Sequence, residues 1–220
     1  DTTEGDTPMD TINELAADER AARIILAVAS EPSDAVTGRM IRTVGATEAV
    51  ARAVADEVPA GPDGDTWQRR LAPRIDVIQA QRVIAETERH GMRVLIPGDA
   101  DWPASVNALG DHAPFALWAK GDTALLSGPL WDRLTVTGAR ASTGYGEHVT
   151  AELVQSAVAD ARMVLSGGAY GIDGAAHRTA LASGGSTIAV LAGGLDRPYP
   201  AGHTELLARV GTDGLLLSEL

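Results

Sequence analysis

Three glycine-rich turns carry the side chains whose types and spacing are best suited to ligand chemistry. Each turn follows a short apolar run: Leu134–Thr137, Met163–Leu165 and Thr187–Leu191. The residues expected to contact a ligand are Gly138, Arg140, Ser166, Gly167, Gly168, Tyr170, Gly171, Asp173, Arg197 and Tyr199. Glycine lets backbone N–H groups approach an anion closely, and arginine pairs with phosphate oxygens. The pattern therefore predicts a site for a phosphate-bearing ligand or a nucleic acid.

Parallel strands joined by helices are the elements that must position these turns. Apolar residues at helical spacing follow the first turn over 149–158, and an alanine-rich helix with Asp173 as its expected N-cap follows the second. A short helix over about 203–209 follows the third, and Leu215–Leu217 is a fourth apolar run. This alternation is typical of an α/β, Rossmann-like fold, a mostly parallel sheet with helices on both faces. Because ligands bind beyond the carboxyl ends of such strands, the three turns should form one site.

Other chemistries find no support in the motifs. Gly138-Ala139-Arg140 places a charged residue where a dinucleotide fingerprint needs a small one, which disfavours a nicotinamide cofactor. The five histidines lack the paired spacing of a zinc helix, so no metal site is predicted. Ser166 lacks a G-x-S-x-G setting, so neither a covalent nucleophile nor an enzyme is expected. His177, one turn past Asp173, could face the ligand or pack beneath the loop.

Four motifs, in this order along the chain, resemble the DNA-processing protein A family (DprA, also called Smf). They are similar to the family's G-S/T-R turn with a following YG, its SGxAxGIDxxAH signature, its GxGLDxxYP element and its LSE. In this sequence they are Thr137–Arg140 with Tyr145-Gly146, Ser166–His177, Gly193–Pro200 and Leu217–Glu219. One position departs from the pattern: the family often has lysine or arginine where this chain has Tyr170, which could stack on a base instead.

The resemblance implies a binding protein. DprA proteins bind incoming single-stranded DNA (ssDNA) during natural transformation and help load RecA onto it, commonly as homodimers. From the residues themselves, Arg140 is expected to contact phosphate, while Arg197 and Tyr199 are expected to line the pocket by stacking. Two alternatives remain open. One is a nucleotide-hydrolysing enzyme of the lysine-decarboxylase-like type, whose PGGxGTxxE signature is absent. The other is a protein-interaction scaffold with a vestigial pocket.

The charge of the chain limits how it can bind DNA. The formal net charge is -12, and the share of residues 1–60 in it is -7. A broad basic face is therefore excluded, whereas a local basic pocket is not. Lys120 is the single lysine, so arginine must supply nearly all cationic contacts. The absence of cysteine is compatible with a reducing, cytoplasmic location.

The chain is expected to divide into three parts. Residues 1–10 are acidic and polar and are interpreted as a disordered lead. Residues 11–60 predict a small helical domain, which by resemblance is sterile-alpha-motif-like or helix-hairpin-helix-like, with a packing role rather than DNA contacts. Residues 61–220 form the expected Rossmann-like DprA domain, interpreted as incomplete at its carboxyl end. Strands at 93–96 and 115–118 should extend its sheet, with Trp102 and Trp118 in the core.

Overall fold

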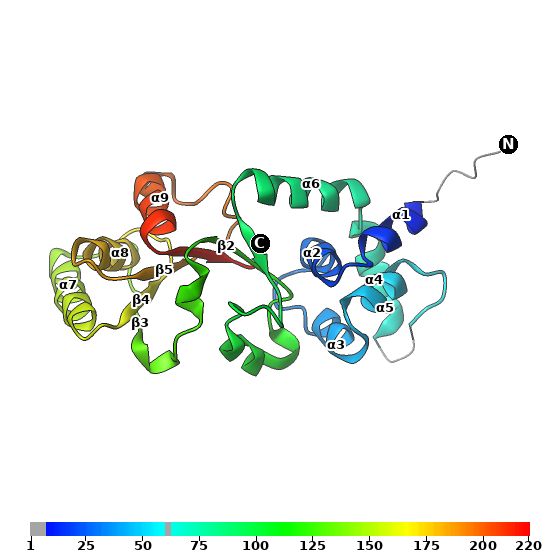
Figure 1. The fold of residues 1–220 in the computed structure, drawn as a ribbon, viewed down its shortest axis with the longest axis horizontal. Coiled ribbons are helices and arrows are strands. Elements are labelled where there is room, and N and C mark those ends of the chain that lie inside the picture. Colours follow the sequence, from blue (N-terminus) through cyan, green and yellow to red (C-terminus); the bar gives the residue numbers. More distant parts are fainter. Residues whose placement is uncertain (1–7, 60–62) are drawn as a thin grey trace. The chain divides into compact units, whose positions relative to one another are not determined.

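The computed structural model describes residues 8–59 and 63–220 (Figure 1). Its α-helices are α1 (Pro8–Leu15), α2 (Glu19–Ala29), α3 (Ala35–Val44), α4 (Ala46–Val54), α5 (Gly64–Leu71), α6 (Val77–Arg89), α7 (Gly144–Ala159), α8 (Ile172–Ala182) and α9 (Thr204–Asp213). Its strands are β1 (Arg93–Leu95), β2 (Leu117–Gly121), β3 (Arg133–Thr135), β4 (Met163–Ser166), β5 (Thr187–Val190) and β6 (Leu215–Ser218). Short 3-10 helices are η1 (Ala72–Arg74), η2 (Ala104–His112), η3 (Thr123–Leu126), η4 (Leu130–Asp132) and η5 (Ala201–His203).

The described chain separates into two compact units. A helical unit holds the chain up to His90 together with Ala104–Ala116, and a sheet unit holds Gly91–Pro103 with Leu117–Leu220. The observed division differs from the expected boundary after residue 60, because α5 packs on α4 and α6 packs on α2. Of the expected disordered lead, residues 1–7 lie outside the described part, whereas 8–10 begin α1.

The core of the helical unit combines alanines, larger aliphatic side chains, one phenylalanine and one tryptophan. Two separate helices, α1 and α2, cover most of residues 8–29, because Asp18 caps α2 by accepting a hydrogen bond from the Ala21 N–H. Trp67 is buried, and its indole N–H donates to Thr37 Oγ1 over 2.9 Å. Gly38 allows α3 to approach η2: a Cβ atom there would lie 1.9 Å from the Asp111 carbonyl oxygen. The unit is thus closely packed even where its two sequence segments meet.

The sheet of the second unit confirms the expected mixed α/β architecture. Its strand order is β1-β2-β6-β5-β4-β3. The four strands β3, β4, β5 and β6 are parallel, as the alternation with helices predicts. β1 and β2 join antiparallel and extend the sheet. The expected strand at 115–118 begins at Leu117, because Phe115 packs in the core of the helical unit.

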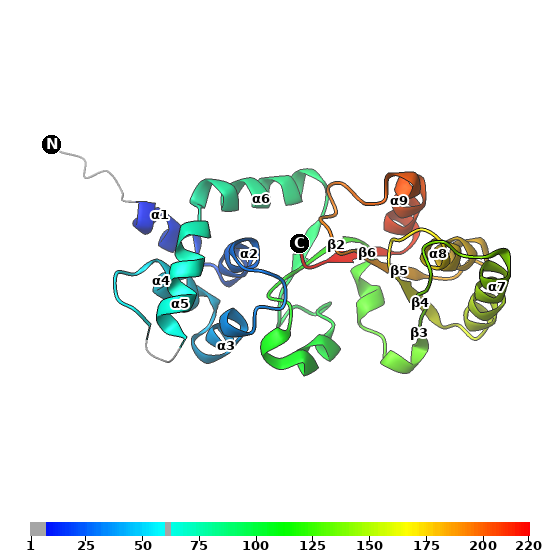
Figure 2. The ribbon, with the colours of Figure 1, turned by 180° about the vertical axis from the view of Figure 1, so that it is seen from behind.

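The crossover helices lie in succession along the sheet. α7 lies beside α8 and α8 beside α9 (Figure 1), and the reverse view shows the same order (Figure 2). The core between α7, α8 and β4 contains Val154, Val164, Ala176 and Ala180, all buried. Trp102 and Trp118 are also buried, which confirms their predicted core positions. This packing fixes the carboxyl ends of β3, β4 and β5, where the glycine-rich turns begin.

Candidate nucleic-acid interface

A pocket of about 270 Å³ opens at the carboxyl ends of the parallel strands. Six of the ten residues predicted from the sequence line it: Arg140, Gly167, Gly168, Tyr170, Asp173 and Tyr199. They come from the turns after β3, β4 and β5. The pocket therefore brings the three turns together at one edge of the sheet, as parallel strands require.

The other four predicted residues do not line this pocket. Gly138 packs against Ile172, whose Cγ1 would lie 2.7 Å from a Cβ at the glycine. The Ser166 hydroxyl is buried and donates to the Val136 carbonyl over 2.6 Å. Gly171 lies against the carbonyl groups of Ala139 and Arg140. The Arg197 side chain is 94% exposed, with its Nε atom 4.0 Å from Asp196 Oδ2. Three of these residues support the turns, whereas Arg197 projects into solvent.

Close contact between two turns explains the glycine at 171. Its φ angle of 76° lies in the left-handed region, and a Cβ atom there would stand 2.2 Å from the Ala139 carbonyl oxygen. That oxygen accepts a hydrogen bond of 3.2 Å from the Ile172 N–H. Gly171, not Asp173, is the N-cap of α8, so the predicted cap is wrong. Only glycine can combine this backbone angle with this contact.

Asp173 instead lies inside the first turn of α8 and faces the loop after β4. It is 6% exposed, and its Oδ2 atom accepts a hydrogen bond of 3.4 Å from the Ala169 N–H. Its Oδ1 atom is buried and has no hydrogen-bond partner within the described residues. A carboxylate in this place is stabilised by the positive end of the helix dipole. Gly167 leaves room for it, since a Cβ there would lie 2.6 Å from Oδ2.

Two histidines hold consecutive carbonyl groups of the same loop. His177 Nε2 lies 2.9 Å from the Gly167 carbonyl oxygen, and His203 Nδ1 lies 3.0 Å from that of Gly168. Because a carbonyl only accepts, both ring nitrogens donate. His177 is fully buried and packs beneath the loop, which decides between its two predicted positions. The loop is thus fixed from below by α8 and by the turn before α9.

The pKa of His177 is lowered from its ordinary value, chiefly because burial penalises the charged ring. Its bond to Gly167 and the charge of Asp173 oppose that shift, whereas His203 and Arg178 add to it. The ring is therefore neutral near pH 7, with its proton on Nε2. Its Nδ1, 2.7 Å from Thr187 Oγ1, is then the acceptor for the threonine hydroxyl.

Tyr170 forms a fixed wall of the pocket. Its hydroxyl accepts a hydrogen bond of 3.1 Å from the Gly202 N–H. Its ring packs edge-on against His203, with centroids 4.8 Å apart and planes at 71°. The side chain still remains 46% exposed, so an aromatic surface is open to a ligand. Tyr199, 76% exposed and followed by a cis peptide bond to Pro200, is a second aromatic side chain at the same pocket.

The pocket-lining residues that were not predicted from the sequence are aliphatic residues, glycines and a proline. The pocket is also lined by Ala169, Val190, Leu191, Ala192, Gly193, Gly194 and Pro200. Gly193 and Gly194 could have been included among the predicted site residues, because they closely follow the predicted strand at Thr187–Leu191. No local pattern marks His203 as a partner of the Gly168 carbonyl, because 35 residues separate them.

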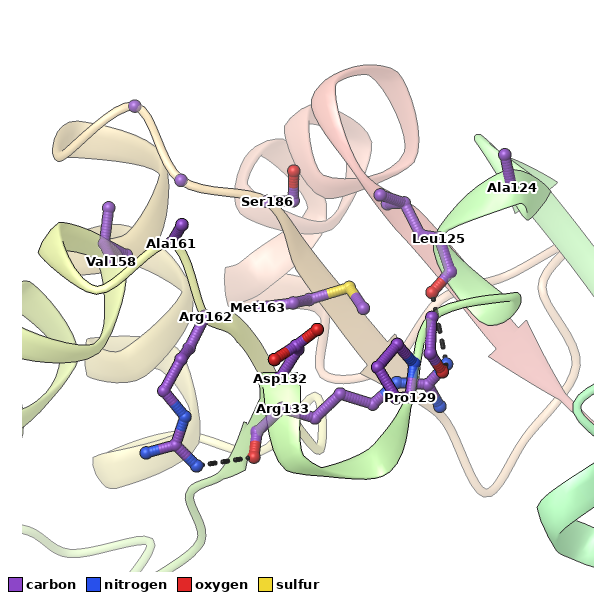
Figure 3. A pocket seen from close by; sticks show the side chains of 13 residues that line it. Ala124, Leu125, Pro129, Asp132, Arg133, Val158, Ala161, Arg162, Met163 and Ser186 are labelled. Carbon is purple, nitrogen blue, oxygen red and sulfur yellow. Dashed lines mark hydrogen bonds between the residues drawn. The ribbon is translucent and has the colours of Figure 1, made fainter.

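A second pocket, of about 510 Å³, lies at the amino ends of β3, β4 and β5 (Figure 3). Two arginines line it, and both hold the backbone around them. Arg133 Nη2 donates to the carbonyl groups of Leu126 and Gly128, and Arg162 Nη2 donates to that of Arg133 over 2.9 Å. Their Nε atoms are buried and find no hydrogen-bond partner in the part of the chain that the structure describes. Because it is lined by Arg133, Met163 and Ser186 at the starts of the strands, this pocket lies at the opposite ends of the strands from the glycine-rich turns.

Across 8–59 and 63–220 no group of three or more His, Cys, Asp or Glu side chains is placed to hold a metal ion. Within the same ranges no helix has the length and apolarity needed to cross a membrane.

Comparison with known sequences adds the family context. Residues 93–220 match the family model described as DNA recombination-mediator protein A. The chain is 41% identical over 200 residues to a DNA processing protein DprA of Mycobacterium tuberculosis, covering 86% of this chain and 50% of that protein. It is 28% identical over 190 residues to the DprA of Bacillus subtilis, covering 86% and 58%. The chain thus spans about half the length of these relatives.

Solved structures give the same result. The X-ray structure of DNA processing protein A from Streptococcus pneumoniae aligns with a TM-score of 0.66 at 25% identity, over 90% of this chain and 65% of that one. A structure of DNA processing protein A from Helicobacter pylori, reported for its unique single-stranded DNA binding mode, aligns with a TM-score of 0.50 at 28% identity, over 59% and 55%. On the family model, the sequence relatives and the fold together, this chain belongs to the DNA recombination-mediator protein A family, DprA/Smf.

Proposed function

We propose that this chain binds single-stranded DNA in the pocket at the carboxyl ends of β3, β4 and β5. The observation that carries the proposal is the convergence of Arg140, Tyr170 and Tyr199 on one pocket beside glycine backbone. An arginine supplies charge for a phosphate, and aromatic rings supply faces for bases. The H. pylori relative, described by its ssDNA binding mode, has the same fold.

The fixed loop after β4 supports a phosphate contact. The histidines hold the carbonyl groups of Gly167 and Gly168 on the side of α8 and η5. A peptide N–H points away from the preceding carbonyl group, so the Gly168 N–H is directed away from His177. A preorganised N–H of this kind binds an anion without further ordering of the loop.

The biological role proposed here is that of a DprA protein. In it, the chain receives incoming ssDNA in natural transformation, helps load RecA in the cytoplasm and acts as a homodimer. The pocket acts by binding, not by catalysis, and needs no cofactor. Within the described residues Arg140 is exposed and has no ion pair, so its charge is available to DNA.

The test is a titration of a fluorescent oligothymidylate of about 20 nucleotides at two salt concentrations. We expect binding that weakens with salt, because each phosphate contact releases counterions. Arg140→Ala should lower both the affinity and the salt dependence. Arg209→Ala, which removes an equal charge from an exposed position on α9, is the matched control.

Two results would contradict the proposal. One is the absence of ssDNA binding at low salt, and the other is binding that Arg140→Ala and Arg209→Ala weaken equally. Incubation with nucleoside monophosphates separates the enzyme alternative, because release of free base would identify a hydrolase.

A further inference from the structure

Three side chains from different parts of the sheet unit form a continuous series that begins at the pocket. Tyr170 lines the pocket and packs edge-on against His203. His203 in turn lies over Gly174: a Cβ atom at that glycine would be 2.9 Å from His203 Nε2 and 3.0 Å from Arg178 Nη1. Arg178 and His203 therefore share the space above one glycine, and the series continues from the pocket onto α8.

The Arg178 side chain is turned toward the end of α8 that faces the pocket. Helical side chains lean toward the N-terminus, and Arg178 stands four residues after Gly174. Because Gly174 has no side chain, the guanidinium lies directly over the first turn of α8. The glycine thus leaves the arginine head close to the loop after β4.

The positive charge of Arg178 is not balanced by a partner within the described residues. Arg178 is exposed, and the described part of the chain gives its guanidinium neither a hydrogen bond nor an ion pair. The first turn of a helix carries partial positive charge, which disfavours a cation. The carboxylate of Asp173 in the same turn is buried and is not paired with this guanidinium. An anion bound beside the first turn would relieve this repulsion.

We propose that Arg178 is a second phosphate-binding residue, so that a DNA strand held at Arg140 continues past Tyr170 and His203 to the first turn of α8. This inference rests on the proposed function, because it assigns the path of the same ligand beyond the pocket. It also predicts a length requirement. A strand that only fills the pocket contacts Arg140, whereas a longer strand contacts both arginines.

The test compares Arg178→Ala, Arg178→Lys and Arg209→Ala with the unmodified chain. Binding of fluorescent oligothymidylates of about 4 and about 15 nucleotides is measured by anisotropy across a salt series. For the longer strand, Arg178→Ala should reduce the slope of log K against log salt by about 0.7, the value for one phosphate contact. That slope corresponds to about fivefold weaker binding near 0.1 M salt. Arg178→Lys should retain the slope, because it retains the charge.

The controls separate this inference from the proposed function. Arg209→Ala should leave the slope unchanged, and Arg178→Ala should leave binding of the short strand unchanged. An unchanged slope for Arg178→Ala, with binding still sensitive to Arg140→Ala, overturns the second contact alone. Equal losses in Arg178→Ala and Arg209→Ala also overturn it, because they would reflect net charge only. Failure of the unmodified chain to bind either strand overturns both proposals.

Discussion

His177 Nε2 donates a hydrogen bond of 2.9 Å to the carbonyl oxygen of Gly167, which places a fully buried ring against the loop after β4. The bond joins α8 to the end of β4, two elements that follow one another in the chain. The position of the loop therefore depends on a side chain that is fully buried.

Two substitutions of His177 should show how much its hydrogen bond to Gly167 contributes to the stability of the chain. His177→Ala leaves a cavity and an unpaired carbonyl, with an expected cost of about 2–4 kcal/mol in the free energy of unfolding. His177→Gln can still donate to Gly167 and should cost less than half of that. Chemical denaturation measures the free energy of unfolding of each variant. Titration with ssDNA shows whether the displaced loop still supports binding. Equal stabilities of the two variants would show that the hydrogen bond contributes nothing.

The stability of the chain should fall in mild acid because of His177. Its pKa is lowered from the ordinary value of 6.5, so below that pH the unfolded chain binds more protons than the folded chain. Stability therefore rises with pH through this window and is lost as the pH falls below about 6.5. Melting temperatures measured between about pH 5 and pH 7 should show a smaller decline for His177→Gln. An identical decline would assign the effect to other groups.

Gly171 and Gly184 form a matched pair for testing the contact between turns. Both have positive φ angles, 76° and 72°, but a Cβ at Gly171 would lie 2.2 Å from the Ala139 oxygen, whereas one at Gly184 meets nothing within 4 Å. Gly184→Ala should cost about 1 kcal/mol through backbone strain alone. Gly171→Ala should cost more, at least about 2 kcal/mol, and should weaken ssDNA binding. Similar unfolding free energies for both variants would contradict the close contact.

Tyr170 should contribute to binding through its ring rather than through its hydroxyl. Tyr170→Phe removes the acceptor for the Gly202 N–H but keeps the aromatic face against His203. We expect its ssDNA affinity to stay within about threefold of that of the unmodified chain, while Tyr170→Ala loses about 1–3 kcal/mol. Anisotropy titrations decide between them. A loss as large in Tyr170→Phe as in Tyr170→Ala would indicate that the hydroxyl is the binding group.

The elements that were predictable from the sequence are those with a local signal. Apolar runs located the parallel strands β3 to β6, because parallel strands buried in a sheet have few polar residues. Helix ends were less certain: Asp173 has the preferred chemistry of an N-cap, yet Gly171 takes that position because of its contact with Ala139.

Features set by contacts between distant residues could not be predicted. Both histidines that hold the loop do so across gaps in the sequence, and nothing near His203 indicates its carbonyl partner. Arg197 illustrates the converse case. Its motif suggests a pocket residue, whereas its side chain is 94% exposed, because local sequence does not specify the direction in which a loop side chain points.

The path of the chain between its two units determines how the protein can be divided. The chain passes between units after residues 90, 103 and 116, so the helical unit is discontinuous. A fragment ending at residue 90 would lack the carbonyl of Asp111 that Gly38 admits and the Phe115 side chain of its core. A fragment beginning at residue 91 would carry that segment without the helices that bury it. Neither unit is therefore separable by a single cut, and a protease acting at one crossing would leave the two units covalently linked.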